Sequence, residues 1–157
     1  MNPSYCTGLI TFFSLQTPGP RSVRSSIIRL LHLLVDEGVA NADDAGLRSN
    51  LWSQAANLTD ILLDALKMYL ESCDEHSPVF AQVRQDVLSE RSAILELFIK
   101  GREFERVALL AEKYIDFGAL LTVCDETMNE NKLNVYIDKL GESGFTEFAC
   151  KWYVVIQ

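Results

Sequence analysis

Apolar residues recur at helical spacing along most of the chain. "SIIRLLHLLVDE", which follows the hydroxyl side chains of Ser22 and Ser25, predicts an apolar helix that ends at Gly38. After a small-residue loop over 39–46, a longer stripe has its apolar members three and four residues apart: Leu47, Leu51, Ala55, Leu58, Leu62, Ala65 and Tyr69. This spacing predicts an amphipathic helix of about six turns. A third helix is expected to begin at Pro78, with Ser77 as its cap, and to end at Gly101.

The second half of the chain is divided into shorter segments. In "ALLAEKYIDFGALLTVCDE", from Ala108 to Glu126, two apolar stripes are separated by little more than Ile115 and Asp116. Further breaks are predicted at Asn129–Glu130 and at Gly141–Glu142. Helices of about 10–13 residues are unstable alone in water, so each must pack against its neighbours.

These patterns predict one fold class. Short helices joined by tight turns form antiparallel hairpins, which stack side by side. We therefore predict an all-α protein with about seven helices, an irregular α-helical solenoid of antiparallel helix pairs over residues 22–157. Residues 1–21 are expected to form an irregular N-terminal leader that ends at Pro18-Gly19-Pro20. No fixed repeat period is evident. "LITFF" and "KWYVVIQ" are the best candidates for strands, and both are also compatible with other structure.

The C-terminal end suggests a fragment. The chain stops on Val154-Val155-Ile156-Gln157 without a cap, a glycine or a polar tail, and domain boundaries seldom follow an apolar helix face directly. We also expect Phe148 and Trp152 to pack on the preceding helix through Tyr136 and Leu140.

The net charge and the spacing of the cysteines limit the kinds of partner and cellular compartment that fit this chain. The net charge is −8, and an acidic surface is repelled by phosphate backbones and by anionic membranes, which argues against binding either as a main task. No C-x-x-C pair occurs among the four cysteines, which favours a reducing compartment. The apolar run over 9–15 has no preceding Lys or Arg and is too short to span a membrane.

Candidate chemistry is sparse. Cys73 and His76 could bind a metal with Asp74 and Glu75, but a structural zinc site needs four N or S ligands, so we interpret this stretch as a frayed acidic helix end. His32, between leucines, is interpreted as a core or boundary histidine rather than a base. The glycosylation sequon at Asn57 falls inside a predicted helix and is interpreted as chance. We therefore assign no catalytic, cofactor-binding or metal-binding residue, and we expect neither a cofactor nor an enzymatic activity.

One long segment carries a family resemblance. "LAEKYIDFGALLTVCDETMNENKLNVYIDKLGESGFTEFACKWYV", from Leu110 to Val154, is similar to part of the C-terminal helical half of the 133-kDa nucleoporin family, scaffold proteins of the nuclear pore Y-complex. "LTDILLDAL" and "ERSAILELFIKGREFERVALLAEKY" resemble the helices that precede this segment in the family. The similar region covers about residues 50–155.

The resemblance implies a non-enzymatic structural scaffold segment located at the nuclear pore and nuclear envelope. It implies roles in nucleocytoplasmic transport, mRNA export and pore assembly. Its implied partners are other Y-complex nucleoporins, with no nucleic acid and no direct membrane contact. The family's β-propeller has no counterpart here, and the helices that dock onto the neighbouring stem nucleoporin would lie beyond Gln157. Two alternatives remain open: another helical solenoid of the adaptor or coat type, and a small secreted or enzymatic helical protein.

Overall fold

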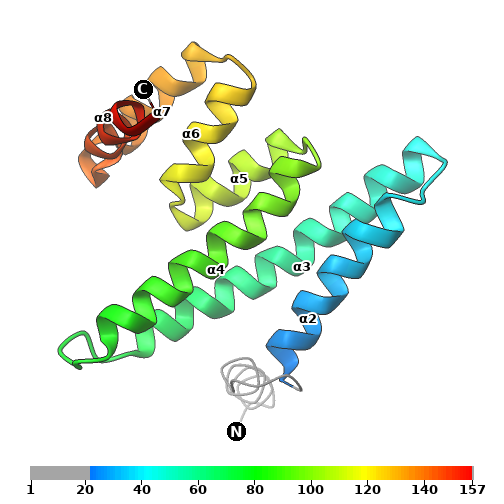
Figure 1. The fold of residues 1–157 in the computed structure, drawn as a ribbon, viewed down its shortest axis with the longest axis horizontal. Coiled ribbons are helices and arrows are strands. Elements are labelled where there is room, and N and C mark those ends of the chain that lie inside the picture. The colour runs from blue at the N-terminus through cyan, green and yellow to red at the C-terminus, as the bar shows by residue number, and fades with distance from the viewer. Residues whose placement is uncertain (1–21, 157) are drawn as a thin grey trace, which may run out of the picture. The chain divides into compact units, whose positions relative to one another are not determined.

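The described part of the protein is helical throughout. The computed structural model describes residues 22–156 and contains no strand in that range (Figure 1). The helices are α2 (Val23–His32), the π-helical turn η1 (Leu33–Val39), α3 (Ala45–Ser72), α4 (Phe80–Lys100), α5 (Phe104–Tyr114), α6 (Phe117–Glu126), α7 (Glu130–Leu140), the 3₁₀ turn η2 (Gly141–Ser143) and α8 (Phe145–Ile156). The predicted all-α stack of about seven helices is confirmed. The leader and the "LITFF" candidate strand lie outside the described residues, and Lys151–Ile156 is helical rather than extended.

The chain divides into two compact units, Met1–Arg91 and Ser92–Gln157, and α4 runs across the boundary. In the first unit, α2 with η1, α3 and the first half of α4 run up, down and up in an antiparallel order (Figure 1). Ser22 caps α2 as predicted, because its Oγ accepts a hydrogen bond from the Ser25 N–H at 3.1 Å. Asp44 caps α3 in the same way, accepting from the Leu47 N–H at 2.7 Å.

Two predicted boundaries in the first unit are wrong by a few residues. The first helix does not end at Gly38 but passes through it in the π-helical turn, where the glycine lies against Leu51 of α3. The third helix begins at Phe80 rather than Pro78, because the Ser77 carbonyl accepts from the Phe80 N–H at 3.0 Å in a preceding turn.

The buried face of α3 is shifted by about one residue from the predicted stripe. Leu47 is 51% exposed, whereas the fully buried positions are Trp52, Ala55, Thr59, Leu62, Leu63 and Leu66. The predicted stripe had included neither Trp52 nor Thr59. Since Trp is the largest apolar side chain in this helix, its burial sets which face is covered.

A charged pair joins two helices of the first unit. The Arg24 guanidinium of α2 binds the Glu90 carboxylate of α4, with Nε to Oε1 at 2.8 Å. Burial lowers the pKa of Arg24, but an arginine remains charged at neutral pH. The pair therefore orients α4 against α2 through a bidentate contact that is partly shielded from water.

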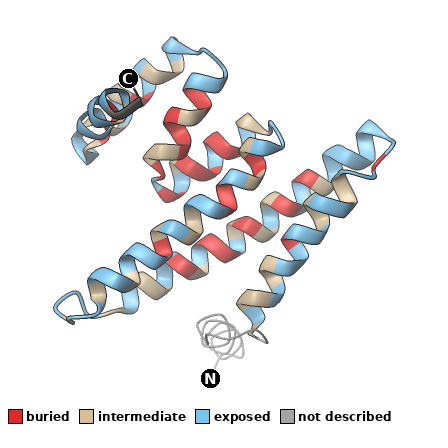
Figure 2. Cartoon of the chain, in the orientation of Figure 1, coloured by how far each residue is buried: buried red, intermediate tan, exposed pale blue. Residues whose placement is uncertain are grey.

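The second unit contains four helices of 10 to 12 residues, α5 to α8, together with the end of α4. Buried positions are most continuous along α5 and α6 (Figure 2). α6 packs against α5, α7 and α8, so it is the central helix of this unit. The predicted short helices, packed against their neighbours, are confirmed here.

The same turn joins α4 to α5, α5 to α6 and α6 to α7. In each, one non-glycine residue has a positive φ: Arg102 (58°), Ile115 (55°) and Met128 (48°), each thirteen residues after the one before. The next residue donates its N–H to the carbonyl five residues back, at 2.9 to 3.0 Å. This bond closes the end of one helix, and the same residue begins the next helix. A local repeat thus exists in this unit, although the sequence shows no fixed period.

The predicted packing of α8 is wrong in its partners. Phe148 lies 5.8 Å, centroid to centroid, from Phe117 of α6, and Trp152 lies beside Phe148. Tyr136 of α7 instead contacts Phe145, which is 0% exposed and also meets Phe117 edge-on at 5.3 Å. The prediction considered only the preceding helix, whereas α8 turns its aromatic face toward α6 as well.

Candidate functional site

The stretch from Cys73 to His76 forms a turn between α3 and α4. The Cys73 thiol lies 3.3 Å from the Tyr69 carbonyl oxygen, and the Asp74 carboxylate accepts a hydrogen bond from the His76 N–H at 3.0 Å. Across residues 22–156, no cluster of three or more His, Cys, Asp or Glu side chains has a geometry that could hold a metal ion. The carboxylate of Asp74 is therefore engaged in closing the loop between α3 and α4.

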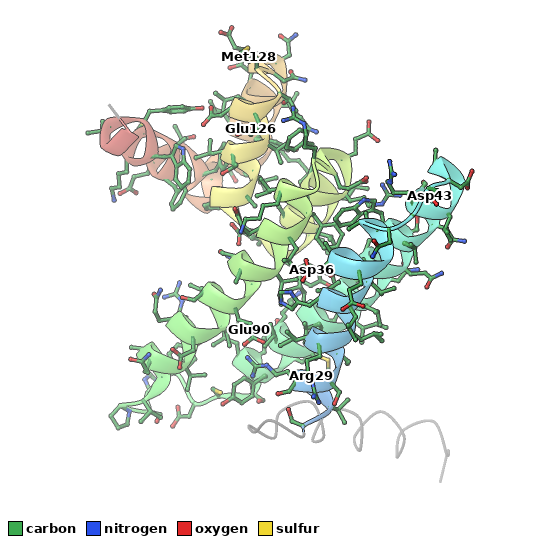
Figure 3. All side chains as sticks on the ribbon, turned by 45° about the vertical axis from the view of Figure 1, so that its right-hand side comes forward. Arg29, Asp36, Asp43, Glu90, Glu126 and Met128 are labelled. Carbon is green, nitrogen blue, oxygen red and sulfur yellow. The ribbon has the colours of Figure 1, made fainter. Side chains whose placement is uncertain are left out.

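Of the two environments expected for His32, the core is excluded and the boundary remains. Its side chain is half exposed, and its Nδ1 lies 3.4 Å from the Asp36 carboxylate, one helical turn later. A residue four positions on shares a helix face, so this pair could have been found from the sequence. With Arg29, Leu33 and Glu37, the pair lines a shallow depression of about 340 Å³ on the α2–η1 surface, where Figure 3 labels Arg29 and Asp36.

The sequon at Asn57 lies in the middle of α3, as expected. Thr59, whose hydroxyl such a sequon requires, is fully buried, and its Oγ1 has no hydrogen-bond partner within the described part of the chain. The hydroxyl is thus inaccessible in this fold.

Two titratable groups in the core of the second unit, the Cys124 thiol and the Tyr136 hydroxyl, favour their uncharged forms. Burial raises the pKa of the Cys124 thiol, against the opposing charge of Lys132, so this thiol is a poor nucleophile. Burial is the main cause that raises the pKa of Tyr136, and the negative charge of Glu112 is the second. Neither group has the lowered pKa of an activated nucleophile.

An open groove lies where α6, α7 and α8 meet in the second unit. This corner groove has a volume of about 640 Å³, and its walls include Cys124, Asp125, Met128, Glu130, Leu133 and Tyr153. The end of α6, the turn after it, the first turns of α7 and the side of α8 each contribute residues. Figure 3 labels Met128, in the turn after α6, and Glu126, the last residue of α6.

One hydrogen bond organises the groove. The Tyr153 hydroxyl of α8 donates to Asp125 Oδ1 of α6 at 2.8 Å. Partial burial and this bond to a carboxylate raise the pKa of Tyr153 to about 12, so the hydroxyl stays protonated and continues to donate. The sequence did not predict this groove, because its walls come from three helices that only the fold brings together.

Within residues 22–156, no helix combines the length and the apolar character needed to cross a bilayer.

Comparison with known proteins identifies relatives over most of the chain. The nuclear pore complex protein Nup133 of Drosophila melanogaster is 33% identical over 136 residues, which cover 87% of this chain and 11% of that protein. Nup133 of Homo sapiens is 30% identical over 140 residues, covering 88% of this chain and 12% of that protein. Nup133 of Danio rerio is 34% identical over 141 residues, covering 87% and 12%. No protein-family model matches the chain.

These relatives agree with the resemblance found in the tail and extend it over almost nine tenths of the chain. The chain spans only 11–12% of their length. It therefore belongs, as a segment, to the family of the nuclear pore complex protein Nup133.

Proposed function

We propose that the chain is a non-enzymatic structural segment of a nuclear pore scaffold protein. The observation that supports it most is the similarity to three Nup133 proteins over 87–88% of the chain, at 30–34% identity. The uniformly helical structure of residues 22–156 suits a role in which packed helices, rather than reactive side chains, carry the function.

The proposal has a finer form. The segment corresponds to part of the C-terminal helical half of such a nucleoporin, with residues 22–157 as the helical stack and residues 1–21 as its leader. It acts at the nuclear pore and nuclear envelope, in nucleocytoplasmic transport, mRNA export and pore assembly. Its partners are other Y-complex nucleoporins, among them the stem neighbour.

Charge supports the expected absence of two other partner classes. With a net charge of −8, the chain is repelled by nucleic-acid phosphates and by anionic lipid headgroups. Neither nucleic acid nor a membrane is therefore a partner in this proposal. The half-exposed His32–Asp36 pair and the corner groove are taken as surface features without catalytic, cofactor or metal roles.

Purification of the gene product from its own cells tests the proposal. The protein is tagged at its chromosomal locus, isolated under gentle conditions, and its co-purifying proteins are quantified by mass spectrometry against an untagged strain. We expect the Y-complex nucleoporins in near-equimolar amounts. Stoichiometric recovery of vesicle-coat or adaptor subunits without nucleoporins would instead favour the helical adaptor alternative and overturn the proposal.

A further inference from the structure

Acidic side chains at the corner groove form no ion pair among the described residues, unlike two acidic side chains elsewhere in the second unit. In the described part of the chain, Glu112 pairs with Lys139 and Glu147 with Lys151. By contrast, Glu126 and Glu130 form no ion pair among these residues. Asp125 accepts the Tyr153 hydroxyl, which is a neutral donor and leaves the charge of the carboxylate uncompensated.

A lysine lies near the groove, but its positive charge does not cancel the negative charge of the carboxylates. Lys132, on the first turn of α7, is close enough to lower the pKa of Cys124, although burial outweighs it. Two carboxylates, of Asp125 and Glu130, line the groove, and Glu126 follows Asp125 at the end of α6. The local field is therefore negative, and it favours a positively charged occupant.

The apolar part of the groove is held toward solvent. Met128 is 91% exposed and has a φ of 48°, a left-handed conformation that a residue with a side chain adopts at a cost. Leu133 lies half-buried on the groove wall. A methionine side chain is long and adaptable, which suits it to cover an apolar group of varied shape.

We propose that the corner groove docks a short segment of a partner protein in which a large apolar side chain is flanked by lysine or arginine. The apolar side chain packs between Met128 and Leu133, and the flanking cations meet Asp125 and Glu130. The bond from Tyr153 holds the Asp125 carboxylate in place before binding, which lowers the entropy lost on docking.

The charged contacts and the apolar contact of this docking can be measured separately. Charge attraction raises the rate of association and depends on salt, whereas the apolar contact controls the rate of dissociation. All residues that line the groove belong to the second unit, so the inference uses no residue of the first.

The test uses a random heptapeptide phage library selected against the immobilised 157-residue chain. We expect the enriched peptides to carry Lys or Arg next to Leu, Met or Phe. Met128→Gly is expected to weaken binding of the enriched peptides about tenfold, as for an interface hot spot. Because glycine adopts the left-handed conformation freely, this variant should keep or improve its thermal stability.

Ile115→Gly is the matched control. Ile115 occupies the equivalent left-handed position in the turn thirteen residues earlier and does not line the groove. The Ile115→Gly variant should bind the enriched peptides as the parent chain does. Glu130→Lys should weaken peptide binding and reduce its dependence on salt. Peptides without basic residues, or peptides bound equally by the parent and by Met128→Gly, would overturn the proposal.

Self-association is the competing use of the surface. Sedimentation velocity of the parent and of Met128→Gly measures it in the same buffer. We expect both to remain at the same oligomeric state over the concentrations used for peptide binding. A parent dimer that Met128→Gly abolishes would overturn the proposal, because the occupant would then be a second copy of this chain.

Discussion

Asp116 offers a sharp test of how the short helices of the second unit are held together. Its side chain is only 3% exposed. Oδ1 accepts a hydrogen bond from the Ala119 N–H at 3.0 Å and so caps α6, and Oδ2 accepts one from the Ser92 hydroxyl at 2.8 Å. Its own N–H closes the end of α5 on the Ala111 carbonyl at 2.9 Å. One residue therefore joins α4, α5 and α6.

Replacing Asp116 with alanine removes the bonds to Ala119 and Ser92 and leaves the backbone bond intact. Loss of an N-cap costs about 1 kcal/mol. The bond from Ser92 to a charged acceptor contributes about 1.5 kcal/mol, which we reduce because Ser92 is exposed and can bond to water instead. We therefore expect Asp116→Ala to lower the free energy of unfolding by about 2 kcal/mol.

The assay is urea denaturation of the 157-residue chain, followed by circular dichroism at a helical wavelength. Asn129→Ala is the matched control, because the exposed Asn129 side chain caps α7 through the Lys132 N–H at 2.9 Å, and its backbone bond to Cys124 of α6 is kept in the variant. It should cost about 1 kcal/mol. A double-mutant cycle with Ser92→Ala should show a coupling energy of about 1 kcal/mol. Equal losses in the two cap variants, or strict additivity with Ser92→Ala, would refute the reasoning.

Three further predictions concern packing, an unpartnered hydroxyl and a titratable tyrosine. Phe145→Ala should lower the free energy of unfolding by about 4 kcal/mol, since Phe145 is fully buried. Phe148→Ala should lower it by less than half as much, since Phe148 is 38% exposed, and urea melts of the two variants that overlay would contradict this. Thr59→Val should raise the melting temperature, because it removes a buried hydroxyl that has no partner among residues 22–156, at a gain of about 1 kcal/mol. An unchanged or lower value would show that this hydroxyl is satisfied. For Tyr153, the folded pKa of about 12 exceeds the usual value of 10, so its contribution is complete below pH 10 and is lost as the pH rises through 12. Tyr153→Phe should flatten the fall in stability over this interval, and identical pH profiles would count against the bond to Asp125.

The positions of the helices could be predicted well from local pattern. The capping side chains of Ser22 and Asp116 and the three-four apolar spacing are short-range signals, and the break at Ile115–Asp116 falls where the two stripes meet. The pair of His32 and Asp36 was equally local, four residues apart, and was missed.

The left-handed residues of the turns could not be predicted in the same way. Gly101 precedes Arg102, and glycine is the residue that the left-handed conformation favours, yet Arg102 adopts it. The bond from the Glu103 N–H to the Phe98 carbonyl closes the end of α4 around Arg102, and the apolar pattern does not show that the left-handed residue comes one position after Gly101.

The corner groove depended on long-range packing. The hydrogen bond from Tyr153 to Asp125 joins residues twenty-eight positions apart in the sequence. The contact between Phe148 of α8 and Phe117 of α6 cannot be predicted from the spacing of apolar residues within one helix. The family resemblance indicated a scaffold role from core residues, but it carried no information on which surface another protein would contact.

The location of the gene product in cells tests the central claim most directly. A fluorescent tag is placed at the chromosomal locus, and the ratio of nuclear-rim to cytoplasmic fluorescence is measured beside a marked nucleoporin in the same cells. The account predicts a punctate rim signal that coincides with the marked nucleoporin, as expected for a relative of Nup133 over 87–88% of the chain. A diffuse cytoplasmic or vesicular signal, with the rim no brighter than its surroundings, would contradict it.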